Sequence, residues 1–188
     1  MSLHAYILAG GKSSRMGEDK GLMLIRDKPL IQYVLDSLSQ VTEQIFIVTS
    51  NQAYRKFGFP LLEDLKKDLG PAGAIDSVLH HSTAERNLVI ACDMPFVDIV
   101  SMNYLLRESH EADITVPMYK NYPEALFGVY KTSCKEAWRL LIEEGILKLS
   151  DLLSHFETNF VDGDRMCESN KKLFQNMNTK DDLTNEWI

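Results

Sequence analysis

The segment from Leu8 to Lys20, LAGGKSSRMGEDK, follows a short apolar run and decides how the fold of the chain is interpreted. Residues Ala5 to Ala9 have the continuous apolar character of a buried strand, and this strand runs directly into the pair Gly10-Gly11. Beyond the loop, Pro29 suits the first position of a helix whose apolar residues fall on one face. A strand, a glycine loop and a helix in this order predict an anion site at the carboxyl end of the first strand.

Strand and helix patterns alternate along the rest of the chain. Further strands are expected at 44–51, 86–96, 112–119, 125–131 and near 159–163, and helices at 72–82, about 98–109, 133–145, 147–156 and after 179. This alternation predicts a three-layer α/β/α fold, with a doubly wound, mostly parallel sheet and helices on both faces. The polar stretch 162–172 is expected to be a surface loop. The length of 188 residues predicts a single domain over residues 1–188.

Composition excludes several classes of protein. The net charge of −7 argues against nucleic acid or an anionic membrane as the main partner. No segment approaches the roughly 20 consecutive apolar residues of a membrane span, so we expect a cytoplasmic protein. The 3 cysteines are widely spaced and match neither a disulfide framework nor a zinc site. The charge is uneven, because the segment from Lys12 to Lys28 is net basic, and an anionic ligand would prefer that end.

The glycine loop does not match the two common phosphate-binding motifs. A P-loop needs a glycine five positions before the Gly-Lys pair, and that position holds Tyr6, in mid-strand. A dinucleotide fingerprint needs GxGxxG, which Gly10-Gly11 followed by Gly17 does not supply. A third design remains, in which glycines let the backbone approach a nucleotide while Arg15 and Lys20 bring positive charge to its phosphates.

Several motifs in sequence order resemble one family. The segment LAGGKSSRMGEDKGLMLIRDKPL resembles the N-terminal signature of the nucleotidyltransferases of molybdenum cofactor maturation and sugar-nucleotide synthesis, most closely the molybdenum cofactor guanylyltransferases. The resemblance continues through TSN at 49–51, ED at 63–64, GPAGAI at 70–75, CDMPF at 92–96 and NMNTKDDL at 176–183. The sequence departs from the family pattern at Ala72, Ala74, Tyr122 and Lys180. The start LAGG resembles the guanylyl-transferring branch, since the cytidylyl branch usually shows LAAG.

The resemblance implies a Rossmann-like nucleotidyltransferase fold and a reaction with two substrates. In that reaction a terminal phosphate of the molybdenum-molybdopterin cofactor attacks the α-phosphorus of GTP and releases pyrophosphate. Such chemistry is mainly positioning and charge neutralisation, so anion donors and a metal are the features to seek. The product would pass to molybdoenzymes or cofactor-insertion proteins.

Candidate site residues follow from the strand ends and from the resemblance. Gly10 and Gly11 are expected to give backbone amides to the phosphates, and the resemblance implies that Leu8 and Ala9 offer backbone groups to the guanine. Arg15 and Lys20 are expected at the triphosphate, with Lys20 near the α-phosphate.

Two further positions concern the metal. Asp93 ends an apolar strand, where a carboxylate is costly unless exposed, paired or metal-bound, and we assign it to Mg2+; the alternative is a capping or turn role. The resemblance implies that Asn178 shares this metal, with Asn176 the weaker candidate. A capping box from Thr179 to Asp182 offers a structural account of the same segment.

Asn51 and Asp64 are the candidates for reading the guanine edge, because an amide and a carboxylate together match its donors and acceptors. Asp68 is the alternative to Asp64, and Asn51 would otherwise be a turn residue. Two other functions remain open: a cytidylyl- or sugar-phosphate nucleotidyltransferase, and a carrier that binds nucleotide or cofactor without turnover. Base preference separates the first from a guanylyltransferase, and metal-independent binding would indicate the second.

Overall fold

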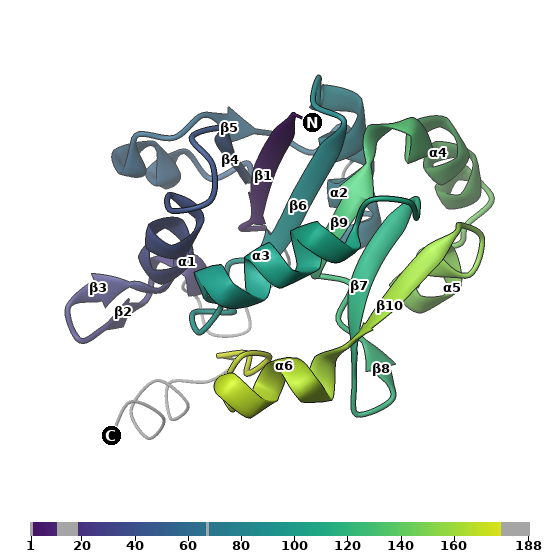
Figure 1. The fold of residues 1–188 in the computed structure, drawn as a ribbon. Coiled ribbons are helices and arrows are strands. Elements are labelled where there is room, and N and C mark those ends of the chain that lie inside the picture. Colours follow the sequence, from purple (N-terminus) through teal and green to yellow (C-terminus); the bar gives the residue numbers. More distant parts are fainter. Residues whose placement is uncertain (1, 11–18, 67, 178–188) are drawn as a thin grey trace.

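The computed structural model describes residues 2–10, 19–66 and 68–177, which form one large sheet covered by helices on both faces (Figure 1). The strands of this sheet lie in the order β10-β7-β9-β6-β1-β4-β5, and β8 pairs with β7. Their bounds are β1 Leu3–Leu8, β4 Ile45–Val48, β5 Leu61–Leu62, β6 Arg86–Ala91, β7 Ile114–Tyr119, β8 Tyr122–Pro123, β9 Phe127–Lys131 and β10 Thr158–Asp162. A separate hairpin pairs β2 (Leu24–Ile25) with β3 (Lys28–Pro29).

Helices connect most of these strands. The α-helices are α1 Leu30–Leu38, α2 Gly70–His81, α3 Ile99–Glu108, α4 Lys135–Glu143, α5 Leu149–Leu153 and α6 Gly163–Ser169. Short 3-10 helices are η2 Lys20–Leu22, η3 Gln52–Phe57 and η4 Thr132–Cys134. Within the described residues, no helix is both long enough and apolar enough to cross a membrane.

The predicted α/β fold is confirmed, but the sheet is more mixed than the alternation of elements predicts. Strands β5, β4, β1 and β6 are parallel to one another, and β10 is parallel to β7. Strand β9 instead runs antiparallel to both of its neighbours, β6 and β7. The reason is the length of the connection: the few residues between Tyr119 and Phe127, which include β8, cannot form the crossover of a dozen or more residues that parallel strands need.

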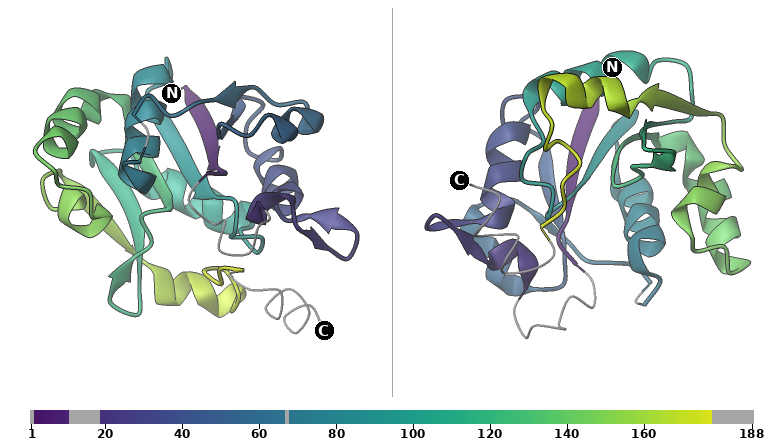
Figure 2. Two further views of the ribbon diagram at one scale, coloured as in Figure 1. Left: turned by 180° about the vertical axis from the view of Figure 1, so that it is seen from behind. Right: turned by 90° about the horizontal axis from the view of Figure 1, so that it is seen from below.

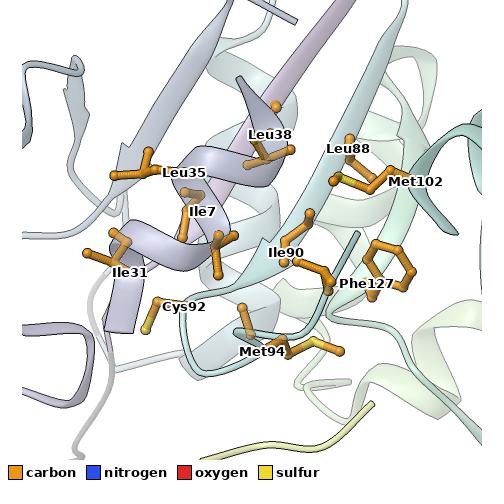
Figure 3. Packing of buried hydrophobic residues seen from close by; sticks show 14 of the residues in the cluster. Ile7, Ile31, Leu35, Leu38, Leu88, Ile90, Cys92, Met94, Met102 and Phe127 are labelled. Atoms are coloured by element: carbon orange, nitrogen blue, oxygen red, sulfur yellow. The ribbon is translucent and has the colours of Figure 1, made fainter. Parts of the chain in front are cut away.

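The sheet is buried on both faces, which explains why its central strands are continuously apolar. On one face Ile7 and Ile90 pack with Ile31 and Leu35 of α1 and with Met102 of α3 (Figure 3). On the other face Tyr6 and Val89 pack against α2 and α4, where Trp138 is fully buried. The views in Figure 2 show these two helical layers on opposite sides of the sheet.

Strand β10 is followed by a helix, so the predicted surface loop over 162–172 is wrong for most of its length. Asp162 begins α6 as its N-cap and accepts a hydrogen bond from the Arg165 amide at 3.0 Å. Met166 is buried in the core cluster with α1 and α3. Because α6 has one buried apolar side chain among many polar ones, its sequence lacks the periodicity that identifies a helix. The helix predicted after Thr179 lies outside the described residues.

An ion pair links α2 to α4, the two helices that cover the face of the sheet carrying Tyr6 and Val89. Asp76 of α2 is fully buried, and Arg139 of α4 donates to its two carboxylate oxygens at 3.2 and 2.9 Å. His80 lies on the same carboxylate, with Nδ1 3.2 Å from Oδ1. Removing one partner of a buried pair leaves a charge without compensation, which is usually strongly destabilising.

We therefore expect Arg139→Met to lower the free energy of unfolding by about 3 kcal/mol, at the low end of the range because Arg139 is partly exposed. Urea denaturation measures this value. Lys66→Met is the control. It breaks the more exposed ion pair between Lys66 and Glu143 of α4 and should change stability little. Equal losses in both variants would contradict the assigned role of the Asp76 pair.

Candidate functional site

The carboxyl ends of four parallel strands meet at one edge of the sheet. In the register of the sheet, Leu8 lies beside Val48 of β4 on one side and Ala91 of β6 on the other. The residues that follow these strands therefore begin at the same level, which is where ligands bind in open α/β sheets. Gly10 follows β1, Asn51 follows β4 and Asp93 follows β6, as the sequence predicts.

Among the described residues, nothing requires glycine at position 10. Its φ angle is not positive, and within that part of the chain an added Cβ would come no closer than 3.9 Å, to the carbonyl oxygen of Val48. The two preceding residues end the ladder of the sheet: the Cys92 amide donates to the Leu8 carbonyl at 3.1 Å, and the Ala9 amide donates to the Val48 carbonyl at 2.9 Å. The Leu8 carbonyl and the Ala9 amide are therefore used in hydrogen bonds within the sheet. The space beside Gly10 suits the close approach of a ligand to the backbone.

Lys20 and Asp93, far apart in the sequence, lie together at this edge. The Lys20 ammonium is 3.6 Å from the Asp93 carboxylate, and both side chains are partly buried. Burial raises the pKa of the Asp93 carboxyl above its ordinary value, and the Lys20 charge opposes that shift. A positive group and an acidic group that face each other in a partly desolvated place are typical of sites for phosphate and metal chemistry.

The C-terminal segment fastens the loop that carries Asp93. The amide of Met177 donates to the Asp93 carbonyl at 3.0 Å. Asn170 Nδ2 donates to the carbonyl of Phe96 at 2.7 Å and to the carboxylate of Asp98 at 2.6 Å. Asp98 in turn caps α3 by accepting from the Ser101 amide at 2.8 Å. The backbone after β6 is thus tied to a segment more than seventy residues later in the chain.

Asn51, predicted to read the guanine edge, has a structural role in this conformation. Its side-chain oxygen caps η3 by accepting from the Ala53 amide at 3.0 Å, and its amide nitrogen donates to Asp19 at 3.0 Å. This is the turn role that the sequence leaves as the alternative. Asp19 also accepts from the Tyr54 hydroxyl. Asp19 and Tyr54 are not among the site residues predicted from the sequence. Asp19 lies within the glycine-loop signature but is assigned no role there, and Tyr54 belongs to no motif that marks a site.

The other predicted residues fall at or beyond the same edge. Asp64 follows β5, lies largely exposed, and has a pKa raised by partial desolvation. Asp68 lies further along this connection in the left-handed backbone region, with φ at 68°. The remaining predicted site residues, Gly11, Arg15 and Asn178, lie outside the described residues.

Comparison with known proteins agrees with the fold and with the family that the sequence resembles. The model of the MobA-like NTP transferase domain matches residues 5–158. The chain is 33% identical over 183 residues to a protein of Flavobacterium johnsoniae named a probable molybdenum cofactor guanylyltransferase, covering 97% of this chain and 95% of that protein. It is also 33% identical to a molybdenum cofactor guanylyltransferase of Vibrio parahaemolyticus, covering 94% and 91% of the two chains.

Solved structures of other proteins share the fold of this chain. The crystal structure of molybdopterin-guanine dinucleotide biosynthesis protein A from Archaeoglobus fulgidus superposes with a TM-score of 0.81 at 27% identity, covering 96% of this chain and 95% of that chain. A 4-diphosphocytidyl-2C-methyl-D-erythritol synthase from Anaerococcus prevotii reaches a TM-score of 0.73 at 12% identity over 97% and 92% of the chains, which shows a shared fold alone. From the match over most of its length, the chain belongs to the MobA-like NTP transferase family and is a nucleotidyltransferase.

Proposed function

We propose that the protein transfers GMP from GTP to the terminal phosphate of the molybdenum-molybdopterin cofactor, giving molybdopterin guanine dinucleotide and pyrophosphate. The observation that carries the proposal is the pairing of Lys20 with Asp93, 3.6 Å apart, at the edge where Gly10 follows β1. Relatives at about a third identity that carry the guanylyltransferase name support the choice of substrates.

The proposed residues divide the work of the reaction. An oxygen of the acceptor phosphate attacks the α-phosphorus, and the bond from that phosphorus to the β-phosphate oxygen breaks to release pyrophosphate. The Lys20 ammonium would stabilise the negative charge that builds up around the α-phosphate. Gly10, with Gly11, would let backbone amides approach the phosphates, and Arg15 would add a second cationic group.

The proposed metal is Mg2+, and its chemistry fits Asp93. Mg2+ takes oxygen ligands and is usually held by one or two carboxylates together with substrate phosphates and water. Among the residues that the structure describes, no three His, Cys, Asp or Glu side chains lie together as a group that could hold a metal ion. Asp93 is the proposed carboxylate ligand, and oxygens of the triphosphate would supply further ligands. Asn178 is proposed as the second protein ligand. The ion would neutralise phosphate charge.

Pyrophosphate release with each nucleotide tests the function. The purified protein is given GTP, CTP or ATP with Mg2+ and molybdenum-molybdopterin cofactor, and a matched reaction omits the cofactor. We expect release with GTP and cofactor together, and little in the other reactions. Release with CTP would move the protein to the cytidylyl branch. Binding without release for any nucleotide would favour the carrier.

Gly10→Ala should weaken GTP binding without loss of stability. An added methyl group has room in the described protein but would occupy the space proposed for the nucleotide. We expect the dissociation constant for GTP to rise about 10-fold, equivalent to about 1.4 kcal/mol. Isothermal titration calorimetry measures the affinity.

Gly128→Ala provides the contrasting control for this substitution. Its added Cβ would lie 2.7 Å from Val116 Cγ1, so this variant should lose stability in thermal denaturation. A Gly10→Ala protein that binds GTP as tightly as the wild type would contradict the close approach proposed at this glycine.

A further inference from the structure

The carboxylate of Asp19 is held by three donors that come from two parts of the chain. Asn51 Nδ2 donates to Oδ2 at 3.0 Å, and the hydroxyl of Tyr54 donates to Oδ1. The amide of Gly21 also reaches Oδ1, at 3.2 Å, so that Asp19 caps η2. Asn51 and Tyr54 lie at the end of β4 and on η3, so this contact ties the end of the glycine-loop segment to the sheet.

Tyr54 provides the fixed part of this arrangement. Its side chain is fully buried in the core cluster, with its ring 5.9 Å from that of Phe57. Burial raises the pKa of its hydroxyl far above the ordinary value, so this hydroxyl stays protonated and donates a hydrogen bond to Asp19. Gly21 packs closely over the same hydroxyl, since an added Cβ would lie 2.3 Å from the Tyr54 oxygen.

Lys20 stands between the two residues that Tyr54 contacts. Asp19 on one side is hydrogen-bonded to the Tyr54 hydroxyl, and Gly21 on the other side lies against it. The backbone of Lys20 is therefore fixed relative to the sheet, and from it the ammonium extends to 3.6 Å from Asp93. A lysine has a long, flexible side chain, so a fixed backbone reduces the range of positions its charge can occupy.

We propose that Tyr54 and Asp19 are positioning residues, which hold Lys20 at the reacting phosphate without touching the substrate. The inference rests on the proposed function for the role of Lys20. It separates two tasks at this edge of the sheet: the Lys20 charge acts on the substrate, and the buried hydroxyl of Tyr54 sets where that charge lies.

Tyr54→Phe is the principal test, because it removes the hydroxyl and keeps the buried ring. We expect kcat for pyrophosphate release to fall about 10-fold, with KM for GTP changed less than about 3-fold, because a misplaced charge is felt mainly in the transition state. Tyr6→Phe is the matched control. Tyr6 is also fully buried, and its hydroxyl lies 3.0 Å from Nδ1 of His81, the last residue of α2. This control should keep wild-type kcat.

Combining variants distinguishes positioning from general damage. In a Lys20→Ala background, Tyr54→Phe should lower kcat by less than about 2-fold, since the charge it positions is already absent. A full 10-fold loss in both backgrounds would overturn the proposal. Should Tyr54→Phe lower the melting temperature more than Tyr6→Phe does, Asp19→Ala replaces it, because it removes the acceptor of the Tyr54 hydroxyl. The same loss of kcat and the same non-additivity with Lys20→Ala are then expected.

A readout without turnover separates this inference from the proposed function. Lysines are labelled by reductive 13C-methylation, and the Lys20 resonance is identified by its absence in Lys20→Ala. We expect Tyr54→Phe to move this resonance towards those of exposed lysines, while Tyr6→Phe leaves it in place. An unchanged Lys20 resonance in Tyr54→Phe would overturn the inference whatever the reaction. A wild-type protein that releases no pyrophosphate would overturn the proposed function alone.

Discussion

Replacing Asp93 with alanine or asparagine is expected to lower turnover by roughly 100-fold or more, about 2.7 kcal/mol of transition-state stabilisation. The reason is the loss of the carboxylate proposed to hold Mg2+ beside Lys20. Pyrophosphate release at saturating GTP and Mg2+ measures the effect. Near-wild-type turnover in either variant would show that Asp93 is not the metal ligand, and collapse of the fold would support a purely structural role.

Asp93→Asn should also stabilise the metal-free protein at neutral pH. Burial raises the folded-state pKa of Asp93 above the ordinary value of 3.8, so as the pH rises the unfolded chain loses this proton before the folded protein does. Stability therefore falls as the pH rises through the window between the two pKa values, and the cost persists above it. Asparagine does not ionise and has no such cost. The stabilities of Asp93→Asn and the wild type should therefore differ least at a pH below the ordinary pKa of the aspartate carboxyl.

Asp36→Asn is the control of opposite sign. Partial burial tends to raise the pKa of Asp36, but hydrogen bonds from Lys28 and Gln32 outweigh it and the pKa is lowered. A carboxyl with a lowered folded-state pKa contributes stability that is present at neutral pH and lost on acidification. The asparagine variant at 36 should therefore be less stable than the wild type at neutral pH. Urea denaturation at several pH values compares both variants with the wild type.

Lys20→Ala has the second large expected effect, again roughly 100-fold or more on turnover, through loss of the charge that stabilises the transition state. KM for GTP should change much less, because the interaction is proposed to strengthen only as the reaction proceeds. Steady-state kinetics at saturating Mg2+ gives both constants. If kcat stays near the wild-type value, Lys20 does not act on the reacting phosphate.

The Lys20→Ala substitution should also change the stability of the protein, independently of its effect on turnover. The ammonium of Lys20 opposes the rise in the pKa of Asp93, so its removal should raise that pKa further and lower stability slightly at neutral pH. In an Asp93→Asn background the same substitution should cost nothing through this route. Equal losses in both backgrounds would mean that the two side chains are not coupled in the folded protein.

The sequence by itself determined the main alternation of strands and helices and the residues at which three of the strands give way to polar side chains. Apolar runs that stop at Gly10, Asn51 and Asp93 are visible without a structure, because a strand buried on both faces must be continuously apolar and must end where polar residues begin. Parallel pairing then places those ends at one edge. The sequence assigns Lys20 to the same site by another route, through the spacing and the resemblance of the glycine-loop segment, because Lys20 does not follow a strand.

Tertiary structure alone shows which polar side chains near the strand ends bind one another. The role of Asn51 depends on its hydrogen bonds to Ala53 and Asp19, and the role of Tyr54 depends on a contact with Asp19 across thirty-five positions of sequence. The antiparallel course of β9 and the helix α6 likewise depend on chain length and on single buried residues. The spacing of apolar residues indicates which face of a segment packs against the core. Hydrogen bonds between distant segments leave no regular pattern in the sequence.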